Sequence, residues 1–478
     1  MKNTYKSIYI CCLTLLMLGS CKKFDSAINT DPNSPTKASG TQLIANAQLF
    51  LPGMSSSPYG VHYPQYLSNT SFTDNSRYVT VNFNFYGLYT GPLMNLENVI
   101  NNASLDANEG PVVNQIAVAK ILKAYFFWHM TDRWGNLPYS EALKGSANFT
   151  PKYDTQQAIY NSLFTLLDEA NAAIVSGNIK NDIVYGGDVA KWKRLGNTIH
   201  ALMALRLSKV DATKGAAEFN KAVTNGMMTA NTDNLSYPHL AEQNNENYWY
   251  NSFTRLGRNW FAVSKPVVDY MQPLNDPRLP VFANKPANTA ITNYVGLDYG
   301  LPGSTTVVIN NFSLLGSNLR LQNSPVALVT YAQSLFAMAE AAKIGWIAGT
   351  DVTAKANYDK AIEFSIRQWN NNDISGLAAY MANADVAYDS NDALRKIGNQ
   401  RWVHLFLHGY EGWAEWRRTG FPNFISPAPN NNGALIPRRE AYPTQERANN
   451  TVNYNAAVAA FPYGGVDDLN ARVWWDKP

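Results

Sequence analysis

Apolar residues recur along this chain at intervals of three and four positions, the spacing that places side chains on one face of a helix. In the clearest example, Asp154 and Gln157 are placed to cap the start of a helix and Gly177 to end it. The apolar positions between them are Ile159, Leu163, Leu166, Leu167, Ala170 and Ile174. This pattern predicts an amphipathic helix through residues 159–174.

Two further stretches share this spacing. Residues 118–129 carry apolar side chains on one helical face, and the pattern ends near Gly135, a residue type that commonly follows the last turn of a helix. Residues 192–206 repeat the arrangement. Both stretches predict long amphipathic helices.

A later pair of stretches predicts a hairpin of two antiparallel helices. Ser324 and Pro325 are placed to open the first helix and Gly349 to end it, and residues 358–369 form the second. Small residues mark the expected crossing, namely Ala337, Ala339, Ala341 and Ala342. The fold we expect is therefore mainly α, built from tetratricopeptide-like helical hairpins, although no clean 34-residue repeat is present.

Long irregular stretches separate the predicted helices. They are rich in Tyr, Asn, Gly and Pro and cover residues 51–86, 229–253, 284–322 and 426–453. Loops of this length are usually functional or disordered, and their aromatic content favours folded, ligand-facing loops on a helical scaffold. No linker divides the body, so we expect one domain over residues 40–478.

Aromatic and amide side chains in the first two of these loops are our candidate ligand-binding residues. Flat rings and amides together could form a stacking platform with hydrogen-bonding groups beside it. The candidates are Tyr63, Tyr66, Tyr78, Trp249, Tyr250 and Asn251. For each ring the alternative is a place in the core, where most aromatic side chains lie.

The first twenty residues have the pattern of a secretory signal peptide. Lys2 and Lys6 precede an apolar stretch from Ile8 to Leu18, which is about half the ~20 residues that a membrane-spanning helix needs. The sequence Leu-Gly-Ser-Cys at residues 18–21 resembles a bacterial lipobox. We therefore predict cleavage after residue 20 and lipid attachment at Cys21.

The anchor that follows from this prediction is an acylated cysteine, for example one carrying palmitate, in the outer membrane. Residues 21–39 form a polar tether rich in turn-forming residues. The remaining cysteines, Cys11 and Cys12, lie in the predicted signal peptide. The mature chain thus has no pair of thiols for a disulfide framework.

Composition points to an uncharged ligand. Only 16% of the residues are charged and the formal net charge is +3, without a long Lys or Arg run that could follow a phosphate backbone. Nucleic acid is therefore not an expected partner. The chain holds 27 Tyr and 12 Trp together with several Asn runs, which suit a sugar ring or a peptide backbone.

Residues that could support catalysis are few. His404 and His408 form the only pair of histidines four positions apart, and no acidic residue lies between them as in zinc proteases. Glu411 and Glu415 would share one helix face and are the candidate carboxylates of a glycosidase. Structural ion pairs are the more common fate of such residues. Their candidate partners are Arg417, Arg418, Arg438 and Arg439.

An ordered set of short motifs resembles the SusD/RagB-like nutrient-binding lipoproteins of the outer membrane, especially their second SusD-like subgroup. The motifs follow the lipobox and extend over nearly the whole chain. They are NTDPN at residues 29–33, AYFF at 124–127, TDRWGNLPYSEA at 131–142, PKYD at 151–154, DPRL at 276–279, AEAA at 339–342, WRRTGFP at 416–422, IPR at 436–438 and WWD at 474–476.

This resemblance implies four tetratricopeptide-like hairpins docked over a SusC-like TonB-dependent barrel, with no catalytic residues. From the residues themselves we expect no metal-ligating cluster and no cofactor. The resemblance also implies a cell-surface lipoprotein at the outer membrane, facing outward, that captures a nutrient and acts as a lid for the transporter. A glycan is favoured as the ligand, and a peptide is the alternative. The alternative from another functional class, an enzyme, is a surface glycosidase. The resemblance assigns no ligand-binding residues, because the binding loops of the family vary.

Overall fold

A computed structural model describes residues 38–55, 58–79, 82–101, 105–303, 305–431 and 433–478. The predicted signal peptide, Cys21 and the tether up to residue 37 lie outside the described residues. The first helix, α2 (Gly40–Gln48), begins after Ser39, whose hydroxyl accepts a hydrogen bond from the backbone of Gln42. The Gln42 side chain accepts one from the backbone of Ser39 in return, which is the reciprocal arrangement of a capping box.

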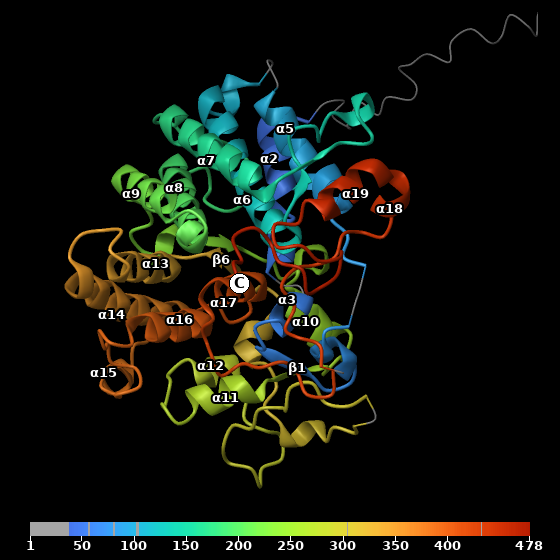
Figure 1. Ribbon diagram of the computed structural model, residues 1–478. Coiled ribbons are helices and arrows are strands. Elements are labelled where there is room, and N and C mark those ends of the chain that lie inside the picture. Colours follow the sequence, from blue (N-terminus) through green and yellow to red (C-terminus); the bar gives the residue numbers. More distant parts are fainter. Residues whose placement is uncertain (1–37, 56–57, 80–81, 102–104, 304, 432) are drawn as a thin grey trace, which may run out of the picture.

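Helices dominate the described chain, and consecutive long helices pack together as hairpins (Figure 1). The hairpins pair α6 with α7, α8 with α9, α13 with α14 and α16 with α17. The longer helices after α2 are α5 (Met94–Ile100), α6 (Val112–Trp134), α7 (Gln156–Ala173), α8 (Val189–Arg206), α9 (Ala212–Asn225), α13 (Tyr331–Lys343), α14 (Thr350–Trp369), α16 (Ala393–His404), α17 (Gly409–Thr419) and α19 (Thr451–Ala459). The predicted tetratricopeptide-like, mainly α fold is confirmed.

Short helices and strands lie mostly between the hairpins. The remaining α-helices, of seven residues or fewer, are α3 (Pro58–His62), α4 (Tyr86–Leu88), α10 (Tyr248–Tyr250), α11 (Lys265–Met271), α12 (Leu279–Phe282), α15 (Leu377–Met381) and α18 (Glu446–Asn449). The strands form three antiparallel pairs: β1 (Leu67–Asn69) with β5 (Phe261–Val263), β2 (Leu137–Pro138) with β3 (Tyr153–Asp154), and β4 (Leu235–Tyr237) with β6 (Val326–Val329).

The local signals at the predicted helices have mixed outcomes. Gly135 follows the last residue of α6 with a φ of 81°, as predicted. The predicted cap of α7 is wrong, because the hydroxyl of Thr155 accepts the hydrogen bond from the backbone of Ala158. Asp154 instead lies in β3, where its carboxylate accepts hydrogen bonds from the backbones of Tyr139 and Ser140.

The predicted hairpin near the middle of the chain is confirmed as α13 and α14, but its start is displaced. Residues 326–329 form a strand, because this valine-rich segment pairs with β4. Helix α13 begins after Thr330, whose hydroxyl accepts a hydrogen bond from the backbone of Gln333. Gly349 precedes α14 and does not end α13. The four alanines expected at the crossing are all fully buried.

A loop-rich region lies below the helical hairpins in the view of Figure 1. It contains β1, α10, α11 and α12 and the long connection toward β6. Strands β1 and β5 pair antiparallel with Leu67 opposite Val263. This pairing fixes the first irregular stretch of the chain against the segment that leads into α11.

Candidate ligand-binding site

Three tyrosines predicted to bind ligand lie in the core instead. Tyr63, Tyr66 and Tyr78 are at most 6% exposed. The hydroxyl of Tyr66 donates to the backbone carbonyl of Trp402 over 2.7 Å, and the ring of Tyr63 packs 4.7 Å from that of Trp413. A ring enclosed in this way presents no face to a ligand in this conformation.

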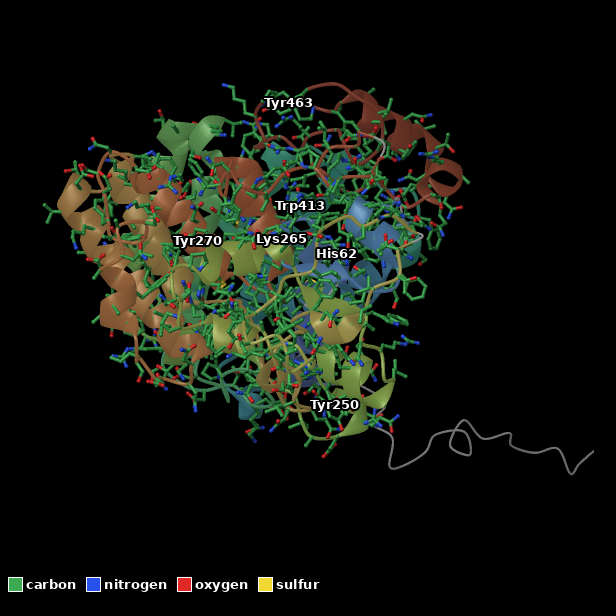
Figure 2. The ribbon with its side chains drawn as sticks, turned by 90° about the horizontal axis from the view of Figure 1, so that it is seen from below. His62, Tyr250, Lys265, Tyr270, Trp413 and Tyr463 are labelled. Atoms are coloured by element: carbon green, nitrogen blue, oxygen red, sulfur yellow. The ribbon has the colours of Figure 1, made fainter. Side chains whose placement is uncertain are left out.

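The second predicted group is divided between core and surface. Trp249 is 2% exposed and packs edge to face against Phe261 at 5.3 Å. Asn251 donates its side-chain amide to a carboxylate oxygen of Glu246 over 2.8 Å. Tyr250 is partly exposed, but Figure 2 shows it well apart from Lys265 and Tyr270. A binding role for Tyr250 and Asn251 stays a prediction.

A hollow of about 610 Å³ lies in the loop-rich region, and two residues beside it, Lys265 and Tyr270, are labelled in Figure 2. It combines aromatic rings, amides and both signs of charge. The residues around it are Gln65, Lys265, Pro266, Asp269, Tyr270, Asp298, Tyr299, Gly300, Leu301, Phe424, Ser426, Pro429 and Asn430. Its volume lies within the range of small-molecule binding sites, about 300–1,000 Å³.

Helix α11 supplies one wall of this hollow, and its start is fixed on two sides. Ser264 donates its hydroxyl to the backbone carbonyl of Gln65, and the backbone of Lys265 donates to the carbonyl of Leu297 over 2.8 Å. The backbone at Gly296 runs so close to the start of α11 that a Cβ added to Gly296 would lie 2.5 Å from the Cα of Lys265. The close approach therefore requires glycine, and it holds the loop of Asp298 beside the helix.

Aromatic rings from separate elements form the most distinctive part of the hollow. Tyr270 on α11 and Phe424, in the loop after α17, are stacked with 4.9 Å between ring centroids and 24° between ring planes. The buried ring of Trp402 packs edge to face against both. Phe424 is 37% exposed and Tyr270 is partly buried, so this wall is both supported and accessible.

The phenol of Tyr270 is neutral at physiological pH. Burial raises its pKa to about 12, and the carboxylate of Asp276 acts in the same direction. A neutral hydroxyl both donates and accepts hydrogen bonds, as sugar hydroxyls do. The amide of Gln400 approaches this hydroxyl to 3.4 Å from the buried side, so Tyr270 offers a sugar the apolar contact of its ring.

Polar groups surround these rings. Lys265 and Asp269 form an ion pair of 2.6 Å on the exposed side of α11, and Asp298 is also exposed. Asn430 donates its amide to the carbonyl of Gly300 over 3.2 Å. Lys265 and Asp269 balance each other and Asp298 lies at the exposed edge, so the aromatic wall and the amide of Asn430 are the groups that suit an uncharged ligand.

The predicted tyrosines of the first loop support this hollow from behind. Gln65, which lines it, donates its amide to the hydroxyl of Tyr78 over 3.0 Å. Tyr78 in turn packs 6.1 Å from Tyr299, another lining residue. The candidates chosen from the sequence therefore include residues beneath this hollow, while Tyr270 and Phe424, which line it, were not among them. The only available signal was their aromatic character, which they share with many core residues.

Glu411 and Glu415, the candidate glycosidase carboxylates, belong to a buried ion network. Both bind the guanidinium of Arg206, with 2.6 Å between Arg206 Nη2 and Glu411 Oε2. Glu415 also binds Arg401 and Arg418. Structural pairing, the fate favoured from sequence, is what the described residues show, with Arg206 as an unforeseen partner.

The other predicted partners of these carboxylates bind elsewhere, which corrects that part of the prediction. Arg417 lies over the ring of Trp413 at 3.5 Å, while Arg438 pairs with Asp476 and Arg439 with Asp467. Of the four predicted arginines, only Arg418 contacts one of the two carboxylates within the described residues.

His404 and His408 are both buried. The two ring nitrogens of His404 hydrogen-bond to the hydroxyls of Thr330 and Ser365 at 2.6 and 2.9 Å. Over the part of the chain that the structure describes, no cluster of three or more side chains could hold a metal ion. Nor does any helix in these described ranges have the length and apolar character needed to cross a membrane.

Comparisons with known proteins agree with this architecture. The family model SusD-like_2, described as starch-binding and associating with the outer membrane, matches residues 32–443. A chitin-binding protein of known structure is 29% identical with a TM-score of 0.82, covering 92% of this chain and all of that one.

Two further solved structures are similar. A SusD homologue from Bacteroides fragilis is 26% identical with a TM-score of 0.78, covering 92% of this chain and all of that one. A chitin-binding SusD homologue from Flavobacterium johnsoniae has a TM-score of 0.75 at 23% identity, covering 92% of this chain and 98% of that one, which shows a common fold. No curated protein matches the chain.

Proposed function

Because this chain belongs to the SusD-like family, whose members associate with the outer membrane, we propose that it is a lipid-anchored cell-surface protein that captures a glycan. It delivers the glycan to a SusC-like TonB-dependent transporter, for which it acts as a lid. It performs no catalysis. The observation that carries the glycan-binding part is the accessible aromatic wall of Tyr270 and Phe424 beside polar side chains.

An N-acetylglucosamine oligomer is the first ligand to test, because two of the similar structures are described as chitin-binding. The hollow fits this chemistry. A stacked ring pair offers an apolar face to the C–H groups of a sugar, while the exposed amide of Asn430 can hydrogen-bond to hydroxyl or acetamido groups.

Glycan binding is tested by calorimetry with a panel of uncharged hexasaccharides built from N-acetylglucosamine, glucose in α-1,4 and β-1,4 linkage, xylose and mannose. We expect at least one to bind and Tyr270→Ala to weaken that binding tenfold or more. Phe149→Ala is the matched control, since Phe149 is 80% exposed and lies outside the hollow. Equal affinity of wild type and Tyr270→Ala would place the site elsewhere. Binding of none of the panel would reject a glycan ligand of these classes.

The peptide alternative is tested on the same protein. An extended peptide would use the same amide through its backbone, but it gains less from two stacked rings than a sugar does. The test is a library of uncharged peptides. If one of them bound more tightly than every hexasaccharide, and Tyr270→Ala weakened that binding, the ligand would be a peptide and not a glycan.

The transporter role is tested by purification from outer membranes. A C-terminally tagged protein is extracted in mild detergent, and the proteins that remain bound are identified by mass spectrometry. We expect a roughly stoichiometric TonB-dependent barrel. Recovery of the protein alone, under conditions that preserve a known barrel complex, would reject the lid role and leave glycan binding to be judged by calorimetry.

A further inference from the structure

A second and larger cleft, of about 1140 Å³, lies between the end of α14, the segment before β6, and α12. No residue that lines it also lines the hollow at Tyr270. Many of its lining residues carry side-chain amides, namely Asn231, Asn234, Asn247, Asn318, Asn323, Gln368, Asn370, Asn371 and Asn372, and apolar residues are among the others. The function proposed above gives this cleft no role.

Many of these amides have unused hydrogen-bonding groups. Within the described part of the chain, the exposed side chains of Asn318, Asn323, Asn371 and Asn372 have no hydrogen-bond partner. Asn370 donates to the carbonyl of Pro277 over 2.9 Å, but its buried side-chain oxygen lacks a partner among the described residues. Water occupies the exposed amides when no ligand is bound, so the cleft has donors and acceptors that a ligand can take over, whereas the buried oxygen of Asn370 calls for a partner.

Charge is nearly absent from the cleft. Arg367 is bound to Glu363, with 2.8 Å between Arg367 Nη2 and Glu363 Oε1. Asp373 is exposed and accepts a hydrogen bond from the backbone of Ser375 over 2.8 Å. An anionic or cationic ligand would find no unpaired buried countercharge here, so the lining favours an uncharged ligand.

The ring of Trp369, at the end of α14, adds a flat apolar surface beside the amides. It is held edge to face against Phe282 at 4.9 Å and donates its indole nitrogen to the carbonyl of His404 over 3.1 Å. An indole fixed next to unpaired amides matches a sugar, whose ring has an apolar face and whose hydroxyls each donate and accept.

The backbone after α14 also has an unusual conformation. Asn371 and Asn372 both have positive φ, of 52° and 67°, a region that residues other than glycine adopt infrequently. Two successive asparagines therefore occupy positions where glycine would cost less backbone strain, and both present amides at the cleft.

We infer that the cleft beside Trp369 is a second glycan-binding site, which takes an uncharged oligosaccharide through the amides of Asn323, Asn371 and Asn372. The inference rests on the proposed function for its ligand class and adds a separate site to it. A polysaccharide chain that spans both sites binds more tightly than a short oligosaccharide, because its second contact is intramolecular.

A buried network connects the walls of the two sites. Arg278, next to Pro277 in the cleft wall, donates to the side-chain oxygen of Gln400 over 2.8 Å. The amide of Gln400 is 3.4 Å from the hydroxyl of Tyr270 in the hollow. Helices α11 and α12, which border the hollow and the cleft respectively, are both found below α16 in Figure 1. The two sites thus share one rigid support.

The test combines calorimetry with hydrogen exchange on the full protein and the hexasaccharide that binds best in the panel described above. The cleft variant combines Asn323→Ala, Asn371→Gly and Asn372→Gly, and the last two changes relieve backbone strain while removing the amides. Asn275→Gly is the matched control, because Asn275 has a φ of 51° and lines neither site.

We expect wild type to bind about two molecules of hexasaccharide, and the cleft variant about one. Hydrogen exchange should slow on binding in residues 317–327 and 367–375, separately from residues 264–272 and 420–430. Affinity of the cleft variant for the parent polysaccharide should fall at least about tenfold, with no change in Asn275→Gly.

Other outcomes separate this inference from the proposed function. One bound molecule with protection confined to residues 264–272 and 420–430 would overturn the second site and leave the proposed function standing. Protection confined to the cleft would remove the site at Tyr270 and keep the cleft. Absence of any binding across the panel would overturn both.

Discussion

Tyr270 and Phe424 lie with their rings nearly parallel, at 24° and 4.9 Å between centroids, although they come from α11 and from the loop that follows α17. Each ring holds the other in place, and Trp402 supports both from the buried side. The orientation of the wall is therefore set before a ligand arrives, which reduces the entropy that binding must overcome.

Phe424→Leu tests the aromatic character of this wall. Leucine keeps most of the apolar volume but removes the ring, so we expect glycan affinity to fall roughly two- to tenfold, corresponding to about 0.5–1.5 kcal/mol for an aromatic contact. Calorimetry measures the change. Phe149→Leu is the matched control, and an equal loss in both variants would show that the ring of Phe424 has no specific role.

Asp276→Asn tests the buried pair beneath the two sites. Asp276 and Arg278 are fully buried as side chains and 2.6 Å apart, so the variant leaves a buried guanidinium without its carboxylate. We expect the free energy of unfolding to fall by about 3–5 kcal/mol, measured by urea denaturation. The matched exposed change, Asp269→Asn, removes the partner of Lys265 and should cost at most about 1 kcal/mol. Similar losses in the two variants would contradict this interpretation.

The predictable part of the fold is the part that local sequence determines. Helices α6, α7 and α8 follow from three- and four-residue spacing, because one apolar face must be buried whatever the helix packs against. Strand β6 was missed because its partner β4 is distant in the sequence, and only that pairing distinguishes Val326–Val329 from the start of a helix.

The sequence predicted which types of residue would line the candidate site, but not which particular residues. Aromatic loops were expected to bind ligand, yet Tyr66 is enclosed by Trp402 and Phe406, whereas Phe424 remains open. Both are aromatic residues in or near irregular segments, so residue type does not separate them. Their difference depends on which distant helix covers each ring, and tertiary packing alone decides that.

Cys21→Ser tests the predicted lipid anchor. A bacterial lipoprotein signal requires the sulfur for diacylglyceryl attachment, so we expect the variant to lose labelled palmitate and leave the outer-membrane fraction. Each buried methylene contributes about 0.8 kcal/mol to membrane binding, and loss of the chains removes that contribution. Mass spectrometry of the N-terminal peptide and fractionation are the measurements. Cys12→Ser is the control and should change neither property, while an acylated peptide from Cys21→Ser would refute the assignment.

Buried histidines predict a loss of stability in weak acid. Burial lowers the pKa of His62 to about 4, of His404 to about 3 and of His408 to about 4. A group whose pKa is lower in the folded than in the unfolded protein binds fewer protons when folded, so stability falls as the pH drops below the unfolded value of about 6.5. Each of these histidines should therefore lower the free energy of unfolding by about 2 kcal/mol between pH 6.5 and 5.

His404→Gln separates this effect from general acid sensitivity. Glutamine keeps a polar group near Thr330 and Ser365 but does not titrate, so the variant should lose about 2 kcal/mol less than wild type between pH 7 and 5. Urea denaturation followed by tryptophan fluorescence at both pH values gives the difference, and the variant's own stability at pH 7 is the reference. Since the comparison uses the change with pH, a constant cost of the substitution cancels. Equal losses in wild type and variant would mean that His404 is already protonated in the folded protein or accessible to solvent.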